Sequence, residues 1–148
     1  MTKRDFTTTL VVDQKPKQVF ESINNPQNWW SGTVNGSADK LNDEFTYRFK
    51  DLHFSRQRIV EMIPDQKVVW LVTESIIYYA EDKNEWTDTK ISFEISEKGD
   101  KTQLRFTHYG LHPDIECFDS CSNSWSQLIH QSLFSLITTG KGKMLELA

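Results

Sequence analysis

The chain has 148 residues, of which 26% are charged, and its 17 basic and 21 acidic side chains give a formal net charge of -4. The length predicts one domain, and the acidic balance argues against nucleic-acid binding, which needs a net basic face. The sequence has no polybasic block and no long apolar run, so it does not predict membrane binding. The first nine residues are too polar for a secretory signal, and we therefore expect a cytoplasmic protein.

The first part of the chain predicts one strand followed by two short helices. Residues 5–13 alternate between apolar and polar side chains, as a half-buried strand does. Pro16 suits the first turn of a helix, and residues 24–26 would end that helix. A second short helix is expected to carry Trp29 and Trp30.

A series of antiparallel strands is expected in the middle of the chain. Alternation predicts strands over residues 44–50 and 67–74, and it predicts a hairpin formed by residues 90–95 and 103–108. Residues 54–62 also favour a strand, but apolar side chains occupy both parities, so its inward face stays open.

The longest predicted element is a helix that runs from the break after Pro113 to Gly140. Ser120 or Ser122 is the expected cap, and Gly140 suits the left-handed position after the end. The single domain should cover residues 1–143, with a disordered tail at 144–148. The inward stripe of this helix comprises Cys121, Trp125, Leu128, Ile129, Ser132, Leu133, Leu136 and Ile137.

This order of elements is accompanied by several local segments: Val19-Phe20, Trp29-Trp30, Pro64 with Val68–Trp70, Thr89–Phe93, Leu104–Gly110 and Ser124–Gly142. Together they resemble the START-like (SRPBCC) superfamily, whose members have the helix-grip fold. The branch it is similar to is the C-terminal domain of the activator of the heat-shock-protein-90 ATPase, including small bacterial members. The resemblance implies an α+β fold in which a curved antiparallel sheet wraps around the long helix, with a cavity between them.

Aromatic residues are the compositional peculiarity: five Trp, four Tyr and nine Phe. On the implied scaffold they either line a ligand cavity or simply fill the core. The predicted ligand-binding residues are Trp29, Trp30, Phe45, Tyr47, Trp70, Tyr78, Phe93, Phe106, His108, Cys121 and Trp125.

Polar candidates are few. His108 has the same parity as the inward residues of its strand, so it could orient a ligand or be an ordinary buried histidine. Glu74 is expected either to be the charged partner of His108 or to lie at the edge of the sheet. An inward Ser132 could bond the carbonyl four residues before it. Cys117 and Cys121 have no CxxC spacing, so we predict no metal site and no cofactor.

Three functions are compatible with these residues. The first is a noncatalytic domain that binds a hydrophobic small molecule such as a lipid, polyketide or flavonoid. The second is a protein-interaction domain with a chaperone as partner, which predicts an exposed Trp29 or Trp30. The third is a cyclase or hydrolase that uses His108, which predicts a second titratable group within hydrogen-bond reach of the imidazole. The sequence favours the first, with no catalytic residue assigned.

Overall fold

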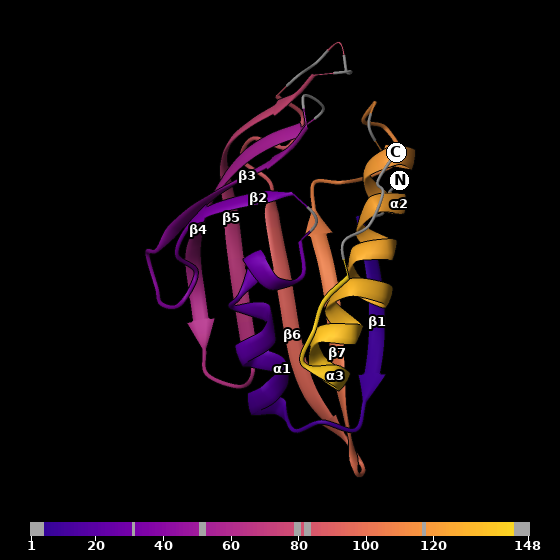
Figure 1. Ribbon diagram of the computed structural model, residues 1–148. Coiled ribbons are helices and arrows are strands. Elements are labelled where there is room, and N and C mark those ends of the chain that lie inside the picture. The colour runs from indigo at the N-terminus through magenta and orange to yellow at the C-terminus, as the bar shows by residue number, and fades with distance from the viewer. Residues whose placement is uncertain are drawn as a thin grey trace.

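The structure is a computed structural model that describes residues 5–30, 32–50, 53–78, 81, 84–116 and 118–143. Its seven strands form one curved antiparallel sheet in the order β1-β7-β6-β5-β4-β3-β2 (Figure 1). The strands are β1 (Phe6–Val12), β2 (Thr33–Gly36), β3 (Glu44–Phe49), β4 (His53–Ile63), β5 (Lys67–Ile77), β6 (Lys90–Lys98) and β7 (Lys101–Tyr109).

The helices lie on one face of this sheet (Figure 1). They are α1 (Pro16–Ile23), the one-turn 3-10 helix η1 (Pro26–Asn28), and the C-terminal series α2 (Phe118–Gln127), η2 (Leu128–Leu133) and α3 (Phe134–Thr139). The α+β helix-grip architecture expected from the sequence is therefore confirmed. None of the helices in the described ranges has the length and apolarity that crossing a bilayer requires.

The start of the chain follows its pattern closely. Strand β1 buries Leu10 and Val12 while Val11 between them is exposed, as alternation predicts. The second helix differs from the prediction, because η1 ends at Asn28 and the two tryptophans follow it. The amides of Trp29 and Trp30 both donate to the Pro26 carbonyl, so this one turn still fixes where the indoles begin.

Strand β2 was not predicted. It is four residues long, and only Val34 in it is partly buried. A strand with one apolar side chain has no alternation to detect. It forms because its backbone pairs with β3, which places Thr33 opposite Arg48 and Gly36 opposite Phe45.

Two irregularities in the pairing of β4 with β5 explain why the central strands resisted prediction. Arg56 pairs with Glu74 but Gln57 pairs with Val72, so one extra residue of β5 is left between them. Such a bulge reverses the alternation of the strand. Glu74 is consequently exposed and pairs with Arg56 at 3.7 Å, so its predicted alternative as a partner of His108 is wrong.

The inward face of β4, which the sequence left open, is mostly polar. Its buried side chains are His53, Ser55, Gln57 and Ile59. Sequence patterns assign polar residues to the solvent face by default, and this strand reverses that assignment.

The C-terminal helical series is continuous and buries the whole predicted stripe. Its middle turn, η2, is a π-helix, a form that is often found at functional sites. The predicted caps are wrong, because the helix starts at Phe118 and the Ser122 hydroxyl instead donates to the Phe118 carbonyl. Gly140 has the expected left-handed conformation, with φ of 86°.

The segment after Gly140 has no secondary structure but is held against the fold. The Lys143 amide donates to Ser132 Oγ at 3.0 Å. A side chain at Gly142 would place its Cβ 2.1 Å from the Asn28 carbonyl oxygen, so only glycine permits this approach. The tail predicted at 144–148 lies outside the described residues.

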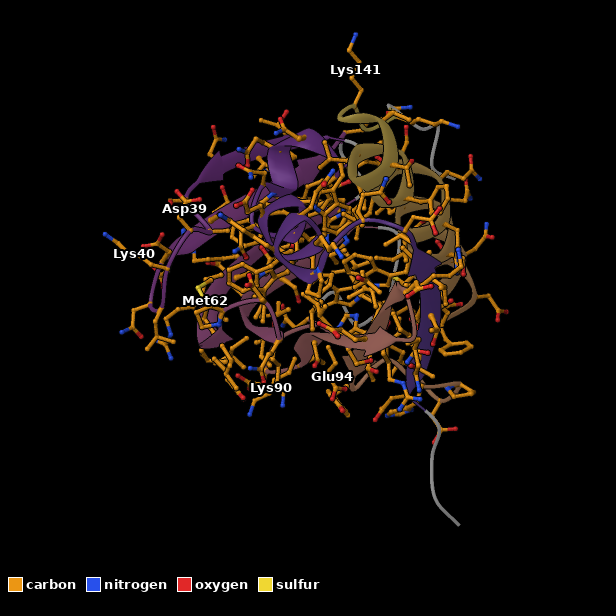
Figure 2. All side chains as sticks on the ribbon, turned by 90° about the horizontal axis from the view of Figure 1, so that it is seen from below. Asp39, Lys40, Met62, Lys90, Glu94 and Lys141 are labelled. Atoms are coloured by element: carbon orange, nitrogen blue, oxygen red, sulfur yellow. The ribbon has the colours of Figure 1, made fainter. Side chains whose placement is uncertain are left out.

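Side chains from the helices and from one face of the sheet point into the space between these two layers (Figure 2). In β6, Lys90 and Glu94 point away from the molecule, whereas Ile91 and Phe93 between them are buried (Figure 2). The concave face of the sheet and the inward stripe of the C-terminal helix thus form one core.

Candidate functional site

The aromatic residues gather on the concave face as one cluster of contacting rings. Trp30 lies at its centre: its ring stacks on Tyr47, with centroids 4.1 Å apart, and lies 5.3 Å from Trp125 of α2. Trp29 stacks on Trp70 at 6.4 Å and meets Phe93 edge-on. The cluster therefore connects the segment that follows η1, the sheet and the long helix.

Most of the predicted ligand-binding residues belong to this aromatic cluster or border it. Cys121 is buried on α2. Tyr78 is elsewhere: it is 37% exposed and lies beside Arg48, whose guanidinium carbon is 5.9 Å from the tyrosine ring. The structure brings together, in the buried cluster, Trp29, Trp30, Phe45, Tyr47, Trp70, Phe93, Phe106, His108 and Trp125.

His108 is fully buried, and both of its ring nitrogens are hydrogen-bonded. Trp125 Nε1 donates to His108 Nδ1 at 3.1 Å. Since an indole can only donate, Nδ1 carries no proton, and the neutral ring must carry its proton on Nε2. Nε2 then donates to Thr89 Oγ1 at 2.8 Å, and that hydroxyl donates to the Trp86 carbonyl at 2.6 Å.

Two aromatic neighbours of this network escaped the sequence prediction. The Trp86 ring lies edge-on between two imidazoles, 4.4 Å from His53 and 4.7 Å from His108, and it stacks on Trp125 at 5.7 Å. Trp86 comes from an irregular loop, where no periodicity marks a residue as inward-facing. His53 begins β4, where the alternation that would orient it is polar.

The buried side chains of His53, Ser55 and Gln57 form a connected set on β4, which we call the polar strip. Gln57 Nε2 donates to Ser55 Oγ at 2.5 Å, and that hydroxyl lies 3.2 Å from His53 Nε2. On the neighbouring part of the sheet, Ser75 Oγ lies 2.9 Å from Thr87 Oγ1. Buried hydroxyl and amide groups therefore lie next to the aromatic cluster.

Several buried polar atoms in this interior have no hydrogen-bond partner within the described ranges. They are the indole nitrogens of Trp29, Trp70 and Trp86 and the amide oxygen of Gln57. Folded proteins pair most buried polar groups, so each such atom calls for an explanation. Here three donors and one acceptor belong to residues of the same core cluster or the adjoining polar strip.

The interior is electrically neutral. Burial lowers the pKa of His53 to about 3, and burial together with the nearby His53 lowers the pKa of His108 to about 3. Burial also raises the pKa of Tyr47 above its ordinary value. Among the buried polar residues of the described ranges, none is Asp, Glu, Lys or Arg.

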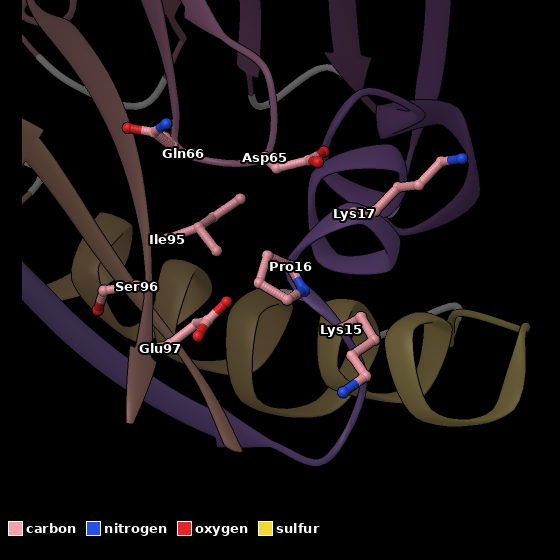
Figure 3. Close-up of a pocket in the computed structure, with 8 residues that line it drawn as sticks. All are labelled: Lys15, Pro16, Lys17, Asp65, Gln66, Ile95, Ser96 and Glu97. Atoms are coloured by element: carbon pink, nitrogen blue, oxygen red, sulfur yellow. The ribbon is translucent and has the colours of Figure 1, made fainter. Parts of the chain in front are cut away.

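A hollow on the outer surface is distinct from the aromatic cluster. This hollow, of about 570 Å³, lies between the start of α1 and the strand ends and is lined by Pro16, Gln66 and Ile95 among others (Figure 3). It contains none of the predicted ligand-binding residues. The described residues contain no group of three or more metal-ligating side chains, and Cys117 lies outside them.

Comparisons with known proteins identify a family and several solved structures to which this chain is similar. The family described as Activator of Hsp90 ATPase homolog 1-like protein matches residues 13–137. The solution structure of the Aha1 dimer from Colwellia psychrerythraea is similar with a TM-score of 0.74 and 20% identity, covering 94% of this chain and 99% of that one. No match was found among curated proteins.

Two further solved structures share the fold. SSP2350 from Staphylococcus saprophyticus has a TM-score of 0.69 at 15% identity, covering 97% of this chain and 98% of that one. DynU16, from the dynemicin biosynthetic locus, has a TM-score of 0.65 at 13% identity; the match covers 92% of this chain but 48% of DynU16. At such identities the likeness establishes the fold, and function has to come from the site.

Proposed function

Because this chain belongs to the Activator of Hsp90 ATPase homolog 1-like family, we propose that it is a noncatalytic binding domain that takes up an apolar small molecule between the sheet and the C-terminal helix. One observation carries the proposal. The aromatic cluster holds buried donors on Trp29, Trp70 and Trp86, and the adjoining polar strip holds a buried acceptor on Gln57, none of which has a partner among the described residues.

Unpaired buried groups disfavour a purely structural core. Each costs roughly 1–3 kcal/mol relative to a satisfied group, and an apolar residue of similar shape would avoid the loss. A ligand with its own polar atoms would recover it. Apolar walls with a few placed polar groups are the usual composition of a small-molecule site.

The magnitudes are consistent with useful affinity. Burying about 200 Å² of ligand apolar surface at ~25 cal/mol per Å² supplies about 5 kcal/mol. Micromolar binding requires about 8 kcal/mol, which leaves about 3 kcal/mol for polar contacts. Two or three hydrogen bonds to unpaired buried groups are enough to provide that difference.

The two alternative functions meet their own stated conditions less well. A partner-binding surface was expected to expose Trp29 or Trp30, and these residues are 1% and 3% exposed. An enzyme that uses His108 was expected to place a second titratable group within hydrogen-bond reach of the imidazole. In the described structure the ring nitrogens bond Trp125 and Thr89 instead.

The test is a titration followed by ¹⁵N NMR at the five indole N–H groups, against a fatty acid, a flavonoid and an aromatic polyketide. We expect saturable shifts at Trp29, Trp70 and Trp86 with at least one compound. Phe106→Asp should abolish them if it folds, whereas Tyr109→Asp should not, since Tyr109 is on the same strand but 47% exposed.

Two results would overturn the proposal. One is an absence of indole shifts with every compound, which would favour the protein-partner hypothesis. The other is shifts that survive Phe106→Asp but vanish in Tyr109→Asp, which would move binding to the outer face of the sheet.

A further inference from the structure

We propose that the polar strip of β4, together with Trp86, is an anchor subsite for an uncharged ligand that bears a hydroxyl group. This inference rests on the proposed function and specifies the chemistry of the ligand. It follows from where the strip lies, which of its atoms are unpaired, and which charges are absent around it.

Strand register places the polar strip in the middle of the concave face. Ser55 is opposite Tyr47 on β3 and Ser75 on β5. Gln57 is likewise opposite Phe45 and Val72. Directly opposed residues have Cβ atoms about 5 Å apart, so the amide of Gln57 emerges among aromatic and aliphatic side chains rather than at a sheet edge.

The hydrogen bonds within the strip leave one acceptor unused. The Gln57 amide nitrogen is occupied by Ser55 Oγ, and that hydroxyl is shared with His53. Gln57 Oε1, on a residue with no exposed surface, has no partner in the part of the chain that the structure describes. It can be satisfied only by a donor, because a carbonyl oxygen has no proton to give.

A matching unused donor lies beside the strip. The Trp86 ring lies 4.4 Å from His53, and Trp86 is 4% exposed with no partner for Nε1. The ring is fixed in place by its contacts with His108 and Trp125. A hydroxyl group both donates and accepts, so a single ligand hydroxyl has the two capacities that Gln57 Oε1 and Trp86 Nε1 require.

The lack of positive charge in the described interior disfavours anionic ligands. The buried polar residues of the described structure include no Lys or Arg, and His53 and His108 bear no charge at neutral pH. A carboxylate taken into this interior would lose its hydration without gaining a counter-charge, which is costly. The subsite should therefore accept an alcohol or phenol and reject a fatty-acid or aryl carboxylate.

Three probes with the same ring system separate these effects: naphthalene, 2-naphthol and 2-naphthoate. Affinities for the full chain are measured by NMR titration at pH 7. We expect 2-naphthol to bind about tenfold or more tightly than naphthalene, as one or two net hydrogen bonds provide. We expect no saturable binding of 2-naphthoate at the indole signals.

Two variants assign that preference to the subsite. Gln57→Leu replaces the amide with an apolar group of similar size, and Trp86→Phe removes the N–H but keeps an aromatic ring. In each variant the affinity for 2-naphthol should fall more than the affinity for naphthalene, so that the ratio of the two affinities approaches one. If Gln57→Leu fails to fold, Trp86→Phe carries the test.

Ser92→Ala is the matched control. Its hydroxyl is also buried and unpaired, but Ser92 alternates with Phe93 and is opposite Val69 and Thr107, on the other face of the sheet. The preference for 2-naphthol should survive in this variant.

The outcomes distinguish this inference from the proposed function. Binding of neither naphthalene nor 2-naphthol would contradict the proposed function itself. Equal binding of the two in the wild type, tight binding of 2-naphthoate, or an unchanged preference in both variants would overturn the anchor subsite and leave apolar binding intact.

Discussion

Acidification from pH 7 to pH 5 should destabilise the folded protein by about 4 kcal/mol, because two histidines must stay neutral inside it. His53 and His108 both have a pKa lowered from 6.5 to about 3, by burial first and, for His108, also by the neighbouring imidazole. Protonation of His108 would in addition place a proton on Nδ1, and this nitrogen could then no longer accept the hydrogen bond from the Trp125 N–H.

The sign follows from proton linkage. A base whose folded pKa is depressed contributes stability above its unfolded pKa, and that contribution is lost as pH falls from 6.5 towards 3. Each such histidine loses about 1.4 kcal/mol per pH unit below 6.5, or about 2 kcal/mol at pH 5. The pair gives about 4 kcal/mol, a large share of the ~5–15 kcal/mol that a domain has in total.

Urea unfolding followed by tryptophan fluorescence at pH 7, 6 and 5 measures this loss. His53→Gln and His108→Gln should each halve the pH dependence, whatever they do to stability at pH 7. His130→Gln is the control, since His130 is exposed and bonded to Thr8. The reasoning is refuted if stability stays constant from pH 7 to pH 5, or if the His53/His108 double variant retains the wild-type slope.

Two further predictions concern single hydrogen bonds. Trp125→Phe should lower the free energy of unfolding by about 1–3 kcal/mol more than Trp70→Phe does, because only the first removes a donor from a buried acceptor; equal losses in urea would contradict the bond to His108. Ser132→Ala should cost about 1–3 kcal/mol, since its buried hydroxyl donates to the Trp29 carbonyl at 2.5 Å. Unaltered stability by the same measurement would argue that this bond is not formed in solution.

Hydrophobic periodicity predicted those elements whose inward residues are apolar. Strand β3 shows this plainly, with Phe45, Tyr47 and Phe49 buried between exposed or half-buried neighbours. The long helix follows the same rule at helical spacing. In both, burial of apolar area orients the element, and that preference is legible in a single sequence.

The same rule failed where tertiary pairing decides orientation. Bulges in the β4–β5 pair reverse the alternation, so Glu74 points outward although it shares the parity of Trp70. Gln57 and His53 are inward because the strands on either side fix β4 in that register. Nothing local to those residues encodes that constraint.

For the candidate site, the sequence could predict that aromatic rings face inward but could not predict their polar partners. The bond from Trp125 to His108 joins residues on α2 and β7, and Trp86 reaches the same place from a loop. Ser132 was expected to bond within its own helix, and it instead bonds Trp29 and Lys143 across the fold. Such contacts depend on packing in three dimensions, which periodicity does not contain.

The indoles themselves separate a structural role from a binding role. The Trp125 N–H is paired with His108, as a stable core requires, whereas those of Trp29, Trp70 and Trp86 are not. If the unpaired indoles serve a ligand, the bound ligand must offset the free energy that their burial costs. At a concentration of 100 times its dissociation constant, a ligand adds about 2.7 kcal/mol to the free energy of unfolding. In a core with only structural indoles, no small molecule would raise the free energy of unfolding in this way. We therefore expect the stabilisation by 2-naphthol to be reduced in Trp86→Phe and kept in Trp125→Phe, which would identify the indoles that serve binding.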